Sequence, residues 1–400
     1  MDTITHGIAG ALIAKAAFNG SDLASAEEMG KRRIATWALT IGAVFPDADV
    51  FREFFSSNPM LIITWHRSIT HSLLCLPIWS VLLAALSLGI ARWRKWNAPS
   101  FPMLTGIYAI GILSHIVLDV LTSFGTMVWS PLEWSRPAWD VLFIIDFTFS
   151  LILLVPQWLA WAYKDQEHMR SRAAVLWVIF TPVPFLISRL GASIGAPVSN
   201  LATLLFTVLF VALFLFPLAR GWGLRVPYSV WNRAGLFLAT IYIVAAAFAH
   251  SAAVERIKTF AAQQKLEVQA IGALPLPPSL WHWNGLVRSQ RGVYAVQMDL
   301  SDSVLRSSTP NNGEIIERTY YPDAAPNTFI EAARNLRQVQ EVLWFSRFPV
   351  TRFHKEGDEA VVEFSDMRFA SLRRDRPSSF TYRVRFSEDG QVLSQGWVRD

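Results

Sequence analysis

The sequence predicts an α-helical integral membrane domain, of six full spans and an amino-terminal helical hairpin, followed by a soluble α+β domain. The 400-residue chain is 52% hydrophobic and only 17% charged, whereas soluble domains average roughly 25% charged residues. Residues 1–251 hold 17 of the 36 Lys and Arg and 13 of the 31 Asp and Glu. Residues 252–400 are ordinarily charged, so the two parts are expected to fold in different surroundings.

Composition also excludes several classes of protein. The chain has a single cysteine, Cys75, which cannot form an internal disulfide framework. Its hydrophobic content excludes a disordered or collagen-like chain. The net charge of +5 is spread over the loops that flank the apolar segments, so no nucleic-acid partner is expected.

Six apolar segments approach the roughly 20 residues that a helix needs to cross a bilayer. They lie at 72–91, 102–122, 139–162, 173–190, 200–219 and 234–251. Two shorter apolar segments, 4–18 and 34–45, precede them and are expected to form a re-entrant or tightly packed hairpin. Residues 1–251 are therefore predicted to be a polytopic membrane domain.

Basic residues predict the orientation of this domain, because Lys and Arg collect in cytoplasmic loops. They cluster between the two short segments and after the first, third and fifth spans, whereas the loops 46–71, 123–138 and 191–199 hold only three. The amino terminus, these three loops and the carboxy-terminal domain are thus expected to face outward.

Residues 252–278 are predicted to form a charged helix and a Pro-rich linker, and residues 279–400 an extracytoplasmic α+β domain. Alternating apolar and polar residues predict strands of a mainly antiparallel sheet, and helical spacing predicts one helix between them. The strands are expected at 292–300, 359–364 and 380–386, and the helix at 327–345.

Histidine and aspartate gather in the first 119 residues, which contain four of the eight histidines. His115 and Asp119 are four residues apart and therefore share one helix face. An ionisable pair within an apolar span is costly and usually functional. This favours a metal-ligand pair over a structural hydrogen bond.

Two further groups precede the first full span. His66 and His71 flank a turn, and neutral imidazole is a common ligand of zinc, iron and manganese. Asp47 and Asp49 follow Pro46, which ends the preceding apolar segment. Alternate residues of an extended chain point to opposite sides, so one of the two is expected to face a shared centre. The alternative for both is a solvated corner.

The predicted topology brings four histidines and three aspartates to the outward ends of their segments. They are His6, Asp47, Asp49, His66, His71, His115 and Asp119. A mixed imidazole–carboxylate group of this kind indicates a site for one or two divalent metal ions.

The motifs that carry these residues resemble the YdjM-like family, whose members are described as membrane-bound, metal-dependent hydrolases of the bacterial inner membrane. They are Thr-His-Gly at 5–7, Phe-Pro-Asp-Ala-Asp at 45–49, His-Arg-Ser-Ile-Thr-His-Ser-Leu at 66–73, and His-x-x-x-Asp at 115–119 followed by Thr-Ser-Phe-Gly. The Trp-Phe-Ser-Arg-Phe-Pro segment at 344–349 is similar to the tail of longer members. The resemblance implies hydrolysis at the inner membrane of a bacterium.

A weaker resemblance runs to zinc-dependent phospholipase C and the P1-type nucleases. It implies that His6, Asp47, His71, His115 and Asp119 surround one or more zinc ions. The chain departs from these enzymes after residue 119, where no second His-x-x-x-Glu pair follows. Either the cluster is smaller, or Asp140 and Asp146 substitute.

The expected function is metal-dependent hydrolysis of a phospholipid or another phosphoester at the outer membrane face. The metal ligands would be His6, Asp47, His66, His71, His115 and Asp119. Asp49 would act as general base or bridging ligand, and Arg67 would hold an anionic substrate oxygen through its forked donors. The Trp-rich loop 123–139 is expected at the headgroup level, where it would admit a lipid. The expected partners are thus the bilayer and this substrate.

Two alternatives remain open at this stage. An ion- or proton-coupled transporter would need ionisable residues in the later spans, but 173–190 and 200–219 contain no acidic residue. A non-catalytic anchor would dock a protein partner through residues 252–400. Metal content distinguishes the anchor from the enzyme.

Overall fold

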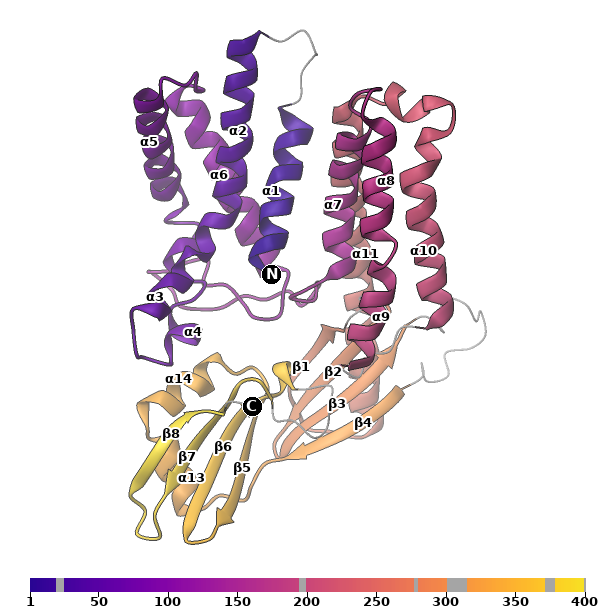
Figure 1. The fold of residues 1–400 in the computed structure, drawn as a ribbon. Helices are drawn as coiled ribbons and strands as arrows, with labels where there is room; N and C mark the ends of the chain where they lie inside the picture. The colour runs from indigo at the N-terminus through magenta and orange to yellow at the C-terminus, as the bar shows by residue number, and fades with distance from the viewer. Residues whose placement is uncertain (19–24, 194–198, 277–279, 301–314, 371–377, 399–400) are drawn as a thin grey trace. The chain divides into compact units, whose positions relative to one another are not determined.

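A computed structural model describes residues 1–18, 25–193, 199–276, 280–300, 315–370 and 378–398. The chain forms two compact units (Figure 1). The first unit comprises 1–48, 67–139 and 144–244, and the second comprises 49–66, 140–143 and 245–400.

The first unit is built from helices. They are α1 (Thr3–Ala17), α2 (Ala26–Val44), α5 (Leu76–Arg94), α6 (Phe101–Val120), α7 (Phe147–Ala162), α8 (Met169–Phe180), α9 (Val183–Ser193), α10 (Asn200–Leu215), the 3₁₀ segments η2 (Ile69–His71) and η3 (Phe216–Arg225), and the first part of α11 (Tyr228–Gln263). The 3₁₀ segment η1 (Phe45–Val50) continues directly from α2 and ends in the second unit, which also contains the single turns α3 (Phe51–Phe54) and α4 (Leu61–Thr64).

Five helical stretches within the described ranges are long and apolar enough to cross a membrane: 76–94, 101–120, 169–190, 203–225 and 228–263. Several apolar helices in the amino-terminal part are thus confirmed. The predicted span at 139–162 is shorter, because α7 has only 16 residues. Its first turn begins after Asp146, whose side chain caps the helix by accepting a hydrogen bond from the Phe149 amide at 3.0 Å.

The predicted hairpin is formed by α1 and α2, but α2 begins eight residues before the expected apolar segment. Ser25 and Glu28 form a capping box, in which each side chain accepts a hydrogen bond from the other residue's amide. The first turns of α2 are charged and lack the apolar residues that predicted the rest of the helix, so its true start was missed.

Small residues let α1, α2 and α6 approach closely. A Cβ atom added at Gly10 of α1 would lie 2.6 Å from the Ala43 Cβ of α2, and one added at Gly111 of α6 would lie 2.6 Å from the Leu39 carbonyl oxygen. Leu39, Leu104 and neighbouring apolar side chains fill the core between these helices. This packing fixes the positions of the groups at the helix ends.

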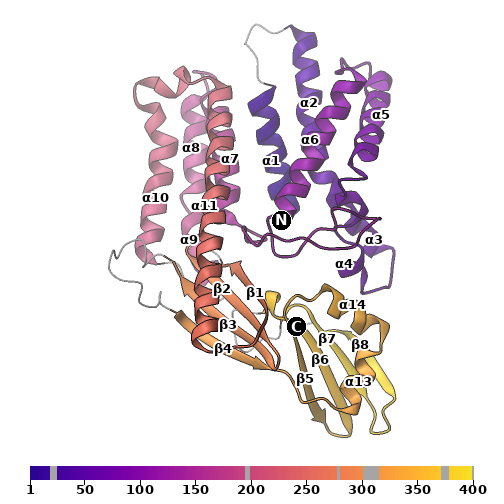
Figure 2. The same ribbon diagram turned by 180° about the vertical axis from the view of Figure 1, so that it is seen from behind.

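The second unit contains two four-stranded antiparallel sheets (Figure 2). The first has the order β1 (Val268–Pro275), β2 (His282–Ser289), β3 (Gly292–Asp299), β4 (Ile315–Pro322), and the second the order β5 (Pro349–Glu356), β6 (Glu359–Asp366), β7 (Thr381–Phe386), β8 (Val392–Trp397). Two helices, α13 (Thr328–Arg334) and α14 (Arg337–Phe345), precede the second sheet, and η4 (Met367–Phe369) follows β6. The three predicted strands are confirmed as β3, β6 and β7.

Two details of this unit differ from expectation. The helix predicted at 327–345 is divided, because Leu336 has an extended backbone with φ −72° and ψ 133°. The segment predicted as helix and linker contains the end of α11 and strand β1, while its residues 277 and 278 lie outside the described residues. Ile257 and Phe260 of α11 pack against Trp283 of the first sheet, so this helix is part of the core there.

Candidate metal centre

Successive turns of α6 carry Gly111, His115 and Asp119 on one face. The closeness of α2 at Gly111 brings His115 against the end of α2, where its Nδ1 lies 2.7 Å from the Ala43 carbonyl oxygen. A carbonyl only accepts hydrogen bonds, so Nδ1 carries the proton and Nε2 presents its lone pair. The backbone of α2 therefore sets the His115 tautomer.

Asp47 reaches the same point from η1, the 3₁₀ turn that begins at the end of α2. Its Oδ1 lies 3.3 Å from His115 Nε2 and 3.6 Å from His71 Nε2, and its Oδ2 accepts a hydrogen bond from Thr3 Oγ1 at 2.6 Å. Burial opposes ionisation of Asp47, but with a proton on the facing imidazole nitrogens the pKa of the carboxyl lies well below its usual value. A cation bound between these groups would favour the Asp47 anion in the same way.

His71 approaches from the loop that precedes α5. Its Nε2 lies 3.0 Å from His115 Nε2 and 3.3 Å from Asp119 Oδ2. The loop is held by backbone hydrogen bonds from Leu73 N to Val128 O and from Met127 N to Arg67 O, both 2.9 Å long. Two neighbouring loop segments thus support the imidazole.

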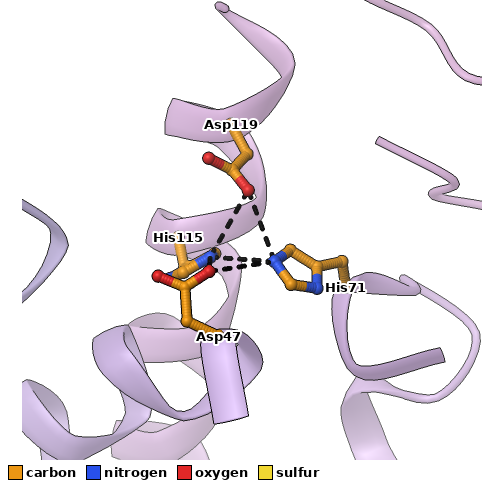
Figure 3. Close-up of side chains that lie close together, drawn as sticks. All are labelled: Asp47, His71, His115 and Asp119. Carbon is orange, nitrogen blue, oxygen red and sulfur yellow. Dashed lines mark hydrogen bonds and ion pairs between the residues drawn. The ribbon is translucent and has the colours of Figure 1, made fainter. Parts of the chain in front are cut away.

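These four side chains form a compact group, named here the His–Asp cluster: Asp47, His71, His115 and Asp119 (Figure 3). One ligand atom from each lies within 4.8 Å of the others. Five separations between them are between 3.0 and 3.6 Å. Tetrahedral ligands about 2.1 Å from a zinc ion would lie about 3.4 Å apart. The donor set and its spacing therefore fit a divalent metal ion.

The charges of the His–Asp cluster support the same conclusion. His115 Nε2 faces His71 Nε2 and two carboxylate oxygens, and all of these groups are buried or nearly so. Lone pairs facing one another in a buried site repel unless a proton or a cation lies between them. A bound cation would satisfy all four groups together.

His6 and Arg67 lie beside the cluster and contact Asp119. The His6 ring stacks on His115 with 3.6 Å between centroids, and its Nε2 lies 3.2 Å from Asp119 Oδ1, which the Met1 amino group also contacts. Arg67 places Nε 3.0 Å from Asp119 Oδ2 and donates through Nη1 to Thr122 Oγ1 at 3.1 Å. Arg67 also has a φ of +63°, a conformation that costs energy in a non-glycine residue.

The other predicted site residues have different partners. Asp49 Oδ1 lies 2.9 Å from His66 Nδ1. Asp140 receives two hydrogen bonds from Arg347, at 3.0 and 2.8 Å. Asp146 caps α7 and accepts a hydrogen bond from Tyr242 at 2.8 Å. None of these residues, nor His6, belongs to the four-residue group found among the described residues.

Three supporting groups were not predicted. The Ala43 carbonyl carries no sequence signal, because a backbone oxygen has no distinctive pattern. Thr122 belongs to the Thr-Ser-Phe-Gly motif at 122–125, but the motif does not indicate its contact with Arg67. Gly111 has a sequence signal: it lies four residues before His115, on the face that already carries His115 and Asp119. A glycine at that spacing indicates close approach of a second helix.

Fold and cluster together define a class: a membrane protein with several apolar helices and a buried His–Asp group that could hold a metal ion. Residues 1–192 match the family model described as YdjM inner membrane protein. The match covers this part of the chain and confirms the resemblance seen in the motifs. Comparisons with curated proteins and with solved structures give no match.

Proposed function

We propose that the protein is a membrane-bound, metal-dependent hydrolase of a phosphoester or lipid-like substrate at the outer face of the bacterial inner membrane. The observation that carries this proposal is the His–Asp cluster, whose four ligand atoms lie within 4.8 Å of one another. Zinc is proposed as the metal because imidazole and carboxylate in tetrahedral spacing suit it.

The proposed chemistry divides between the ion and the chain. A bound divalent ion would lower the pKa of water to about 7 and polarise a phosphoryl oxygen. Asp49 is proposed as the general base, with His66 as its hydrogen-bonded partner. Arg67 is proposed to orient an anionic oxygen, since it already holds a carboxylate, that of Asp119.

Access to the cluster is expected from the side of Asp47. His71, His115 and Asp119 are fully buried, whereas the Asp47 side chain is 9% exposed. Thr3 hydrogen-bonds to the outer oxygen of Asp47. A substrate oxygen would therefore enter between η1 and the start of α1.

Metal content and activity of the purified full-length protein test the proposal together. We expect wild type to retain at least one equivalent of zinc, and His71→Ala and Asp119→Asn to lose it. His168→Ala is a matched control, because His168 is exposed and pairs only locally, with Asp165. Hydrolysis of a bilayer-presented phosphoester should follow metal content across the four proteins.

Two outcomes would contradict the proposal. A wild-type protein without stoichiometric divalent metal would favour the non-catalytic anchor. Metal retention without hydrolysis of soluble or bilayer-presented phosphoesters would make the site a structural one. Equal activity on both substrate forms would reject only the membrane-surface substrate.

A further inference from the structure

A cavity of about 1150 Å³ lies in the first unit, between α1, α2, α7, α8 and the start of α11. Typical small-molecule pockets have volumes of about 300–1000 Å³, so it has room for a large ligand. It includes Lys15, in the last turn of α1, whereas His6 lies in the first turns of that helix. Nine residues of helix separate the two by about 13 Å, so this cavity is distinct from the His–Asp cluster.

Three basic side chains line the cavity: Lys15, Arg32 and Lys164. Its described lining contains no acidic residue. Lys15 donates a hydrogen bond to the neutral Gln157 amide at 2.9 Å, which holds the ammonium group in place without cancelling its charge. The cavity therefore carries an uncompensated positive charge.

Nearby acidic residues are paired with other groups. Glu27 forms a 2.6 Å ion pair with Lys31, and Glu28 caps α2. Asp165 forms a 2.7 Å ion pair with Arg172. These contacts engage three acids of the adjoining segments, and they favour an anion from outside the chain as the occupant of the cavity.

The remaining walls are apolar and aromatic. Trp158 and Trp161 of α7, Leu176 and Ile179 of α8, and Tyr228 of α11 line them. Tryptophan and tyrosine with basic residues at helix ends are typical of the headgroup level of a bilayer. Apolar side chains along α8 offer a surface for hydrocarbon beside the charged group.

We propose that this cavity binds an anionic phospholipid, with Lys15, Arg32 and Lys164 holding the phosphate and the α8 wall contacting the acyl chains. Basic pockets between membrane helices bind anionic lipid headgroups in this way. The bases belong to helix ends and loops predicted to face the cytoplasm, so the lipid would come from the inner leaflet. This proposal does not depend on the hydrolase activity.

Native mass spectrometry of the purified full-length protein, titrated with phosphatidylglycerol, phosphatidylcholine or inorganic phosphate, tests it. We expect tight binding of phosphatidylglycerol only. Arg32→Gln with Lys164→Gln should weaken it about 30-fold, since each base near a lipid surface contributes about fivefold. Arg33→Gln with Arg170→Gln removes the same charge from exposed side chains outside the cavity lining and should bind as wild type does.

Three results would overturn the proposal. An equal loss of phosphatidylglycerol affinity in both double variants would show that the lipid is attracted by positive charge in general and not by the cavity. If phosphatidylcholine binds equally well, the negative headgroup charge does not determine binding. If inorganic phosphate competes at equal concentration, the acyl chains do not contribute to binding. If the double variant in the cavity fails to fold, Lys164→Gln alone, at an exposed position, should still weaken binding about fivefold.

Discussion

Asp119 connects the His–Asp cluster to its surroundings. One oxygen contacts His6, and the other lies near His71, His115 and Arg67. All these side chains are fully or almost fully buried, so the carboxylate compensates charge as well as offering a ligand atom. A single substitution here is expected to affect both stability and metal binding.

Asp119→Asn tests the contribution of this carboxylate to stability when a chelator has removed any bound metal. The substitution removes the Asp119 carboxylate from the buried Arg67 guanidinium, and breaking a buried ion pair typically costs about 3–5 kcal/mol. The free energy of unfolding, measured by denaturant titration, should fall by about that amount. Arg67→Met combined with Asp119→Asn should recover part of the loss, and a double variant less stable than Asp119→Asn would contradict the ion pair.

Sequence reasoning at the residue scale identified which side chains gather but not how they are held. The ligand types and the His-x-x-x-Asp spacing placed the four residues of the cluster among seven candidates, but they did not separate these four from His6, Asp49 and His66. The Ala43 contact joins residues 72 apart in the sequence, and the Arg67–Thr122 contact joins residues 55 apart. Such contacts depend on helix packing, which local patterns do not specify.

At the scale of elements, the approach of α2 to α6 determines whether the cluster can form. Asp47 follows α2, and His115 and Asp119 lie on α6, so the distance between the two helices sets the ligand spacing. Gly111→Val should force these helices apart, because a Cβ there would lie 2.6 Å from the Leu39 carbonyl oxygen. Overpacking of this kind costs about 1–3 kcal/mol, and zinc affinity should fall about tenfold or more.

Gly106→Val provides the control for this prediction. Gly106 lies on the same helix, and a Cβ added there meets nothing within 4 Å. Gly106→Val and Gly111→Val change helix propensity by the same amount. Competition titration with a zinc chelator measures both affinities, and equal affinities in the two variants would show that helix spacing does not control the site.

Element boundaries were predicted least well, for local reasons. The start of α2 depends on a capping box rather than on apolar spacing. Strand β8 has mostly exposed residues, so it lacks the alternation that identified β3, β6 and β7. Its pairing with β7 is a contact that an alternation pattern cannot reveal.

At the scale of the molecule, composition alone separated a charge-poor helical part from an ordinarily charged part with strands. It could not predict that the latter forms two sheets, because strand pairing joins distant segments. Phe348, just before β5, and Val350 of β5 pack against Leu286 and Val293 of the first sheet. The second unit therefore has a core of its own, built without any residue of the His–Asp cluster.

Metal binding should therefore stabilise one unit more than the other. An ion held by the His–Asp cluster would link η1, η2 and α6, and a ligand at 100 times its Kd adds about 2.7 kcal/mol to the stability of the state that binds it. Hydrogen exchange measured with zinc and with chelator should show slower exchange with zinc over 45–50 and 67–76. Strands β2, β3, β6 and β7 should exchange at the same rate with zinc and with chelator. In His71→Ala, residues 45–50 and 67–76 should also exchange at the same rate in the two conditions. Equal protection of the sheets, or a zinc effect that persists in His71→Ala, would place the bound ion elsewhere in the chain.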